Sequence, residues 1–573
     1  MRRGSIEANP LLVAERRAFP EGRIRILILV ALLVPTLLFV FRYDLATGFA
    51  IISGGRSDGA IEIAILEHWH NVIRGLEHPF TTAYFYPYRG TLAYNDGYFF
   101  YGVLYSLLRF GGSDPFLASE VVDIVIRAIG FLSFHLLMRR VFRQSFAMSA
   151  FGAVLFSVNS SMMLHGGAHA QLLTVAFVPL FAVALHEMVL GLRAGLQRPF
   201  LGWGATACLI LGVWLMTAYY MAWFTIYFSL FLLVAFLVCA PGDERRAFFA
   251  ALVRQWKQAG LLILCLLAAL LPFLALYLPK AMQTGMWSFK DPAYYALSPL
   301  DIIHVGRESW IWGAFDGWIN ERLRSGFPPF SEHTVGFAPF MLIVFLIGVW
   351  LAFGQRVPSS GTTVVIRATA IAVLLSWIFV FRFGSHTPWH LIFNAVPGAK
   401  ALRAISRYQL FLAVPVTAVA VATLGRLSHR APGWILYGAC AFLLVEQATG
   451  YHNVFDQNRR EEMARLEALP APPDRCRVFF VSVPRPTLPG EDPAWNATYS
   501  HNTDAMVISE ILHIPTIDGF STFLPPDWNF IYGDHATYMA HVEDYLGRHR
   551  VEGACALDLH DLTWDTEPFG KPM

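Results

Sequence analysis

The chain has 573 residues, of which 55% are hydrophobic and only 15% are charged, and its formal net charge is +2. Soluble globular proteins carry about 25% charged residues, so this composition excludes an ordinary soluble protein and favours an integral membrane protein. The small net charge and the lack of a basic tract argue against a nucleic-acid partner.

Apolar stretches recur along the whole chain and predict about eleven transmembrane helices in an all-α polytopic fold. They cover residues 26–41, 121–138, 146–158, 172–190, 203–217, 221–238, 261–278, 335–353, 368–381, 410–424 and 434–445. Residues 98–110 are too short and too rich in tyrosine for a span, so we interpret them as interfacial or re-entrant. We expect no cleavable signal, because no small-residue cleavage site follows the first apolar stretch.

Positive charge predicts the orientation of these spans, because basic loops stay in the cytoplasm. The N-terminal arm and every second loop after it are basic. An odd number of spans then places the N-terminus in the cytoplasm and puts the C-terminal tail outside, together with the long loops 42–120, 279–334 and 382–407. The basic residues are Arg2, Arg3, Arg16, Arg17, Arg23, Arg25, Arg139, Arg140, Arg143, Arg193, Arg198, Arg245, Arg246, Arg254, Lys257, Arg356, Arg367, Arg426 and Arg430.

The tail is predicted to be a separate domain, so that residues 1–450 form the transmembrane domain and residues 451–573 a small extracytoplasmic α/β domain. Residues 476–483 and 554–559 have the pattern of buried strands, and residues 538–548 that of a helix. If the strands are neighbours, Cys476 and Cys555 could form a disulfide in an oxidising compartment. The alternative is two buried thiols. No CxxC pair is present, which argues against a zinc or redox motif.

Asp58 is the first candidate catalytic residue and lies in Ser57-Asp58-Gly59, shortly after the first predicted span. Its small neighbours let a substrate approach, and its carboxylate could take a proton from an incoming hydroxyl as a general base. The alternative is an N-cap for a helix that begins at Ala60, because aspartate favours that position.

Asp96 is the second candidate, in Asn95-Asp96-Gly97 of the same long loop. Two carboxylates on one side of the membrane could share acid–base work or bind substrate hydroxyls. The same three residues are also typical of an ordinary turn.

Four histidines are predicted on that side of the membrane. His68 and His70 lie on an amphipathic stretch around residues 62–76, and His165 and His169 lie in the short loop after the third span. Imidazoles beside carboxylates would permit a divalent metal, but two glycines interrupt the His165–His169 spacing. We therefore expect no metal or other cofactor, and interpret His70, His165 and His169 as ligands of substrate hydroxyls or phosphate.

Arg403 and Arg407 end the loop before the tenth predicted span. Guanidinium groups suit phosphate, and a position at the bilayer surface suits a lipid phosphate. Interfacial snorkelling is the alternative. Asp123 and Arg127 lie four residues apart in the second span, and charges there usually face the bundle interior. We expect a neutralising intrahelical pair, with a proton relay as the alternative.

These features together resemble the GT-C superfamily of polytopic glycosyltransferases, in a bacterial branch similar to protein mannosyltransferases and glycosyltransferase family 39. A tail element at residues 517–526 is also similar, although Asp518, Phe520 and Thr522 depart from the branch pattern. The matching segments are Ser57-Asp58-Gly59, Tyr86-Pro87-Tyr88-Arg89-Gly90, Asn95-Asp96, His165 with His169 and Pro179, Glu332-His333-Thr334-Val335-Gly336, and Leu402-Arg403-Ala404-Ile405-Ser406-Arg407.

The resemblance implies an inverting hexosyl- or pentosyltransferase of the bacterial cytoplasmic membrane. Such an enzyme takes a sugar from a polyprenyl-phosphate donor and transfers it to a glycan, lipid or protein acceptor on the outer face. Asp58 would occupy the place of the first-loop catalytic carboxylate, and Asp96 would stand in for a second acid. The implied partners are the donor, the acceptor and membrane lipids.

Three alternatives stay open at this point. A lipid or polysaccharide transporter would carry charges at mid-membrane and an inverted repeat, of which the sequence shows only Asp123 and Arg127. A glycan polymerase or ligase would depend on the arginines of an outer loop rather than on Asp58. A non-catalytic accessory protein would use the outer domain to recruit a partner.

Overall fold

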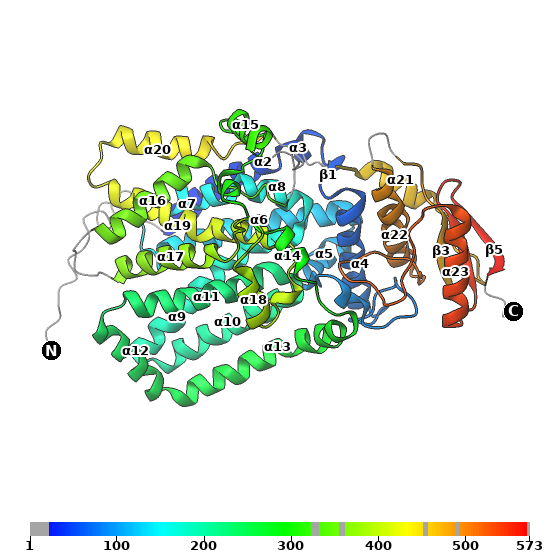
Figure 1. Cartoon of the computed structure of the whole chain (residues 1–573), viewed down its shortest axis with the longest axis horizontal. Coiled ribbons are helices and arrows are strands. Elements are labelled where there is room, and N and C mark those ends of the chain that lie inside the picture. The colour runs from blue at the N-terminus through cyan, green and yellow to red at the C-terminus, as the bar shows by residue number, and fades with distance from the viewer. Residues whose placement is uncertain (1–21, 324–331, 355–360, 451–455, 488–491, 570–573) are drawn as a thin grey trace.

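The computed structural model describes residues 22–323, 332–354, 361–450, 456–487 and 492–569. A bundle of long helices fills most of the molecule, and a small unit of helices and strands lies at one end of its long axis (Figure 1). The predicted fold class, an all-α polytopic membrane protein with a small C-terminal α/β part, is confirmed. Arg2, Arg3, Arg16, Arg17 and Arg356 lie outside the described residues.

Within the described residues, eight stretches are long and apolar enough to cross a membrane, and a ninth arises if a pair bent by 42° is one span. The bent pair is α7 (Phe146–Ser157) with α8 (Ser160–Ala168). The predicted number of about eleven is reached when the shorter helices α16 (Pro339–Gly354) and α20 (Gly433–Val445) are included. The eight are α2 (Gly22–Val40), α6 (Pro115–Arg140), η3 with α9 (Ala170–Ala194), α10 (Gln197–Thr217), α11 (Tyr219–Cys239), α13 (Trp256–Thr284), α17 (Gly361–Ile378) and η6 with α19 (Ile405–Leu427).

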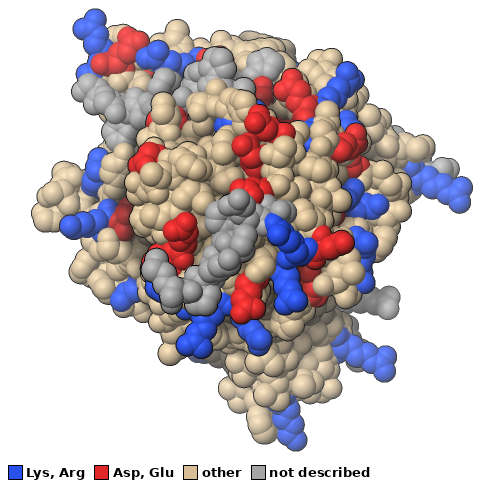
Figure 2. Space-filling model, turned by 90° about the vertical axis from the view of Figure 1, so that its right-hand side faces the viewer, with Lys and Arg blue, Asp and Glu red and all other residues tan. Residues whose placement is uncertain are grey.

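The two ends of the long axis of the molecule carry different kinds of elements. The polar helix α12 (Gly242–Arg254), which carries three of the basic residues named above, lies at one end of the long axis. The C-terminal helices α21 (Arg459–Ala468), α22 (Pro493–Leu512) and α23 (His535–His549) lie at the other end (Figure 1). The face at that second end shows acidic and basic side chains interspersed (Figure 2).

Helix α4 (Ala60–Ile73) corrects the expectation of an amphipathic surface stretch. Every residue from Ala60 to Asn71 is buried, including polar Glu62, Glu67 and His68. The cause is that α4 packs between α5 (Phe99–Phe110) and α22 of the C-terminal part. The polar face of α4 is therefore covered by protein as well as its apolar face. Its polar groups then need hydrogen-bond partners inside the protein.

The C-terminal part contains a three-stranded sheet, as predicted in outline. Strand β3 (Val478–Val483) pairs in parallel with β4 (Ala554–Asp558), which pairs antiparallel with β5 (Thr563–Phe569). Because β3 and β4 are neighbours, Cys476 and Cys555 meet, and the structure joins them in a disulfide. A short β1–β2 pairing of Ile51–Ile52 with Gln457–Asn458 also attaches this part to the first long loop.

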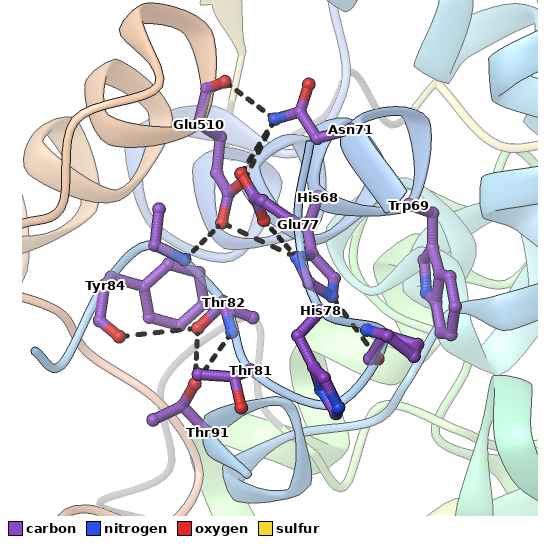
Figure 3. A network of polar contacts seen from close by, with 12 residues as sticks. His68, Trp69, Asn71, Glu77, His78, Thr81, Thr82, Tyr84, Thr91 and Glu510 are labelled. Carbon is purple, nitrogen blue, oxygen red and sulfur yellow. Dashed lines mark hydrogen bonds and ion pairs between the residues drawn. The ribbon is translucent and has the colours of Figure 1, made fainter. Parts of the chain in front are cut away.

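A buried hydrogen-bond network, which we call the latch, fastens α22 to α4 and the loop after it (Figure 3). The Nδ1 atom of His68 lies 2.6 Å from Oε2 of Glu77. Glu510 on α22 accepts from the backbone N–H of Ala83 at 3.0 Å and from the Asn71 amide at 3.2 Å. The side chains of His68 and Glu510 are fully buried, so the latch satisfies polar groups that would otherwise oppose docking.

Asp123 and Arg127 differ from the expected ion pair. Among the described residues, no hydrogen bond or salt bridge joins these two side chains, and Arg127 donates instead to the carbonyl of Met162 at 3.2 Å. Both residues line a cavity beside α8.

We expect the substitution Glu510→Ala to weaken the latch, because it leaves the backbone N–H of Ala83 without its buried acceptor and removes one of the acceptors of the Asn71 amide. Such a loss costs about 1–3 kcal/mol. Thermal unfolding should therefore occur at lower temperature, and hydrogen exchange in α4 and α22 should be faster. The control Glu543→Ala changes an exposed glutamate of α23 and should leave both measurements unchanged; equal results for the two variants would contradict the latch.

Candidate active site

A glycine-rich turn, η1 (Gly55–Gly59), presents Asp58. Gly54 has φ of +102°, and a Cβ at Gly54 would lie only 2.8 Å from the Cα of Gly59, so the turn closes without room for a side chain at that point. The side chain of Asp58 is 46% exposed. Gly59 holds the N-cap position of α4 and no side chain caps that helix, so the alternative of Asp58 as an N-cap is not realised.

His169 stands between two carboxylates. Its Nδ1 atom is 3.1 Å from Oδ2 of Asp58, and its Nε2 atom is 3.5 Å from Oε1 of Glu332. The Nδ1 atom lacks the geometry of a hydrogen bond, so the contact with Asp58 is a close charge contact. Glu332 is not among the site residues predicted from the sequence, although it belongs to the Glu332-His333-Thr334 segment that resembles GT-C proteins.

Arg407 anchors Glu332 through a two-pronged contact. Its Nε atom donates to Oε2 of Glu332 at 2.8 Å, and its Nη2 atom donates to Oε1. Its guanidinium also lies over the ring of Tyr220, 5.1 Å from the centroid. Because two donors of its guanidinium already bind Glu332, Arg407 balances the charge of this carboxylate inside the protein and is not available to bind a lipid phosphate.

The charges in this cluster keep the carboxylates ionised. Burial alone would raise the pKa of Asp58, but the contact with His169 and the charge of Arg407 outweigh it and hold that pKa below its ordinary value. Burial likewise opposes ionisation of Glu332, yet Arg407 and His169 hold its pKa well below the usual range. Burial and Arg407 would lower the pKa of His169, but the two carboxylates beside it raise that pKa.

Asp96 has a structural partner at the start of a neighbouring helix. Its Oδ1 atom accepts from the backbone N–H of Tyr219 at 2.7 Å, which satisfies the first residue of α11. Burial raises the pKa of Asp96 to about 6, although the Tyr219 N–H and the charge of Arg407 oppose this. The positive charge of Arg407 therefore favours the ionised form of both Asp96 and Asp58, while no described contact joins the two carboxylates directly.

Arg403 is exposed, unlike Arg407. Its guanidinium lies 5.2 Å from the ring centroid of Trp287 and 5.6 Å from that of Tyr295. Its backbone N–H donates to the hydroxyl of Tyr220 at 2.8 Å. Two aromatic rings thus hold an accessible cation near the Arg407 cluster, in a position where it could meet an anionic group.

The other two predicted histidines are placed differently. His165 is fully buried, and its Nε2 atom lies 2.9 Å from the carbonyl of Thr334. It therefore supports the loop that carries Glu332. His70 packs against the ring of Phe110, 4.8 Å between centroids, and no described contact links it to Asp58 or His169. The structure thus brings His169 into the cluster, places His165 behind it and leaves His70 outside.

The C-terminal part also borders the site. Thr503 on α22 donates to the carbonyl of Arg56, two residues before Asp58, at 2.8 Å. The backbone N–H of Phe523 donates to the carbonyl of Tyr94 at 2.9 Å, and the Phe523 ring lies 5.4 Å from that of Trp287. The tail element at 517–526 therefore packs against both the Asn95-Asp96 turn and the aromatic setting of Arg403.

The histidines and nearby carboxylates of the sequence would permit a divalent metal. Among the described residues, one group of His, Cys, Asp and Glu converges closely enough to chelate a single ion, and it is His68, Glu77 and Glu510 of the latch. These groups already bond to one another, to Asn71 and to the Ala83 N–H, so a hydrogen-bonded latch explains them. Asp58, His169 and Glu332 do not converge to that degree.

No family model and no curated protein matches the chain. Three solved structures resemble it. An oligosaccharyltransferase of Archaeoglobus fulgidus, solved with Zn and sulfate, has a TM-score of 0.48 and 14% identity and covers 89% of this chain and 66% of its own. The arabinofuranosyltransferase AftD from Mycobacteria has a TM-score of 0.41 and 16% identity and covers 87% and 32%.

The third similar structure is ArnT from Cupriavidus metallidurans bound to undecaprenyl phosphate, with a TM-score of 0.36 and 12% identity, covering 94% of each chain. All three are GT-C glycosyltransferases, the superfamily that the sequence resembles, and the matches do not single out a branch. The chain spans about two thirds of the length of the oligosaccharyltransferase and one third of that of AftD.

We expect Arg407 and Glu332 to behave as one coupled unit. Removing one partner of a buried ion pair leaves an uncompensated charge and costs about 3–5 kcal/mol, so Arg407→Met and Glu332→Gln should each lower the unfolding temperature strongly. The double variant should lose less than the sum of the two. Arg193→Ala, which breaks a more exposed pair with Glu244 at 3.3 Å, should cost about 0–1 kcal/mol. Additive losses at 407 and 332 would refute the coupling.

Proposed function

We propose that the protein is a membrane glycosyltransferase that moves a sugar from a polyprenyl-phosphate donor to a glycan, lipid or protein acceptor, with inversion at the anomeric carbon. The observation that supports this most directly is Asp58: an accessible carboxylate on a tight turn, whose pKa is held below its ordinary value by His169 and Arg407. A carboxylate kept ionised at an accessible position suits a general base.

In the proposed step, Asp58 takes the proton from an acceptor hydroxyl while that oxygen bonds to the anomeric carbon of the donor sugar. The bond from that carbon to the phosphate oxygen breaks, and the electron pair leaves with the lipid phosphate. Attack opposite the leaving group inverts the configuration. His169, charged between Asp58 and Glu332, fixes the position of the base.

Arg403 is the residue we assign to the leaving phosphate. It is exposed, it carries a permanent charge, and two aromatic rings restrict its position. A preorganised cation stabilises charge that develops on the leaving group. The guanidinium of Arg407 stays bound to Glu332, and its positive charge acts on the site only at a distance. Its effect on the donor is therefore indirect.

The alternatives draw less support from the described residues. A transporter would need functional charges along a path through the bundle, whereas the charges around Asp58 gather on loops and helix ends. A polymerase or ligase that depends on outer-loop arginines would fit Arg403, but it gives no role to the ionised Asp58–His169 contact. An accessory protein would not need an accessible ionised carboxylate at the turn.

We further propose that the enzyme lies in the cytoplasmic membrane of a bacterium, with its N-terminus in the cytoplasm and residues 451–573 as an extracytoplasmic domain. The alternation of basic loops supports this orientation. So does the disulfide between Cys476 and Cys555, because disulfides persist in oxidising compartments. The transferred unit would be a hexose or a pentose.

The substitution Asp58→Asn separates a catalytic role from a structural one. Asparagine keeps the size of the side chain but cannot act as the base, and loss of a general base lowers the rate by about 10²–10⁴. We expect the variant to insert and unfold like the wild type while transferring almost no sugar from a polyprenyl-phosphate donor. Asp243→Asn, an exposed acid on α12, is the comparison for charge loss alone. Turnover within a few-fold of wild type would remove Asp58 as the base.

A second test uses pH. The pKa of Asp96 is raised to about 6, whereas that of Asp58 is lowered. As pH falls through 6, Asp96 takes up a proton and loses its charge, while Asp58 stays ionised. If Asp96 accepts hydrogen bonds from substrate hydroxyls, kcat/KM should fall with an apparent pKa near 6, and Asp96→Asn should remove this step from the profile. An unchanged step in that variant would assign it to another group.

A further inference from the structure

A cavity of about 240 Å³ with several charged residues in its wall lies beside the turn that carries Asp58, between the end of α2, α3 (Arg42–Ala46), the first half of α6 and α8. Its rim includes the exposed Ala46 and Thr47. The charged side chains of its wall are Arg42, Asp44, Glu120, Asp123, Arg127 and Asp456.

Three of these side chains are more than nine-tenths buried and still have polar atoms without a partner. Glu120 is 4% exposed, Asp123 8% and Arg127 6%. The unpartnered atoms are Oε1 of Glu120, Oδ1 of Asp123, and Nε and Nη1 of Arg127. Buried polar atoms are nearly always hydrogen-bonded, so this wall offers both acceptors and donors to a molecule inside the cavity.

The side chains that line the cavity indicate which class of ligand it could bind. The carboxylates of the cavity do not converge as closely as those of the latch, so they are not arranged around one metal ion. Asp44, Glu120, Asp123 and Asp456 outnumber the guanidinium groups of Arg42 and Arg127, which disfavours a phosphate. Hydroxyl groups donate to carboxylates and accept from guanidinium, so a ring with many hydroxyls matches this mixture.

The cavity adjoins the candidate active site. A smaller cavity shares Ser53, Glu120, Asp123 and Gly167 with it, and is bounded by Gly54 and Gly59, the two glycines that close the Asp58 turn. Gly166 and Gly167, in the wall of the larger cavity, come directly before Ala168 and His169 in the chain. A ligand in the cavity would therefore lie next to the segments that carry Asp58 and His169.

We propose that this cavity is a saccharide subsite, which binds a sugar unit of the acceptor next to the unit that reacts at Asp58. The proposal rests on the proposed function and narrows its acceptor to a glycan or glycolipid. In the cavity, Arg127, Glu120 and Asp123 bind hydroxyls of a neutral ring, and the donor phosphate meets Arg403.

Saturation-transfer NMR on the purified full-length protein in nanodiscs tests the subsite without any transfer reaction. The probes are the methyl glycosides of mannose, galactose and arabinofuranose, with cyclohexylmethanol as a hydroxyl-poor control. We expect at least one glycoside to bind and the control not to bind. Asp123→Asn should weaken that binding about tenfold or more, since it removes a charge-assisted acceptor. Ala46→Trp should weaken it similarly by blocking the rim from outside.

Asp243→Asn, an exposed acid on α12, is the matched control and should bind like the wild type. Because Ala46 is exposed, Ala46→Trp keeps the test valid if Asp123→Asn fails to fold. Binding of no glycoside, or binding that Ala46→Trp leaves unchanged, would overturn the subsite. Asp58→Asn should still bind the glycoside; if that variant kept transfer activity, the proposed function would fail whatever the binding result.

Discussion

The ion pair between Arg407 and Glu332 is the interaction on which the geometry of the candidate site depends. It joins two long loops, 279–334 and 382–407, and reaches the first long loop through His169, which touches both Glu332 and Asp58. Desolvation makes a buried pair costly unless its remaining atoms are also satisfied. Here His169 supplies the further contact on the carboxylate side, and the ring of Tyr220 covers the guanidinium. Four segments that are distant in sequence are therefore held in one arrangement around a single accessible carboxylate.

The C-terminal part belongs to that arrangement. Helix α4 leads directly out of the Asp58 turn, and its polar residues are buried because α22 covers them and the latch satisfies them. The same helix α22 holds the backbone before Asp58 through Thr503. The domain that the sequence predicts to be separate thus shares buried polar groups with the first long loop, so its displacement would expose α4 and loosen the turn. This dependence gives the tail a direct physical connection to the position of Asp58.

Much of the fold could be predicted from the sequence because its signals are local. Hydropathy located the long apolar helices of the described bundle, and the strand patterns around Cys476 and Cys555 indicated that these two cysteines could pair. The 20-residue helix α22 was not predicted. The errors arose where distant segments meet. Residues 60–71 have the pattern of an amphipathic helix, but only the docking of α22 decides that both faces are buried. Asp123 and Arg127 have the four-residue spacing of a helical ion pair, yet both side chains line a cavity and no salt bridge between them is described. In the site, Arg407 was recognised as a cation, but its partner Glu332 lies 75 positions away in the chain and no local periodicity connects them.

The distribution of charge around Asp58 gives the proposed reaction a direction. Arg403 is accessible among aromatic rings, whereas the cavity wall carries buried acceptor atoms of Glu120 and Asp123 beside donor atoms of Arg127. An anionic donor would therefore be favoured at Arg403, and a neutral, hydroxyl-rich acceptor would be favoured in the cavity. Asp58 adjoins the cavities through Gly54 and Gly59, and its pKa is depressed by His169 and Arg407. The Arg407–Glu332 pair would then serve specificity as well as catalysis, because it fixes the base beside the site proposed for the acceptor.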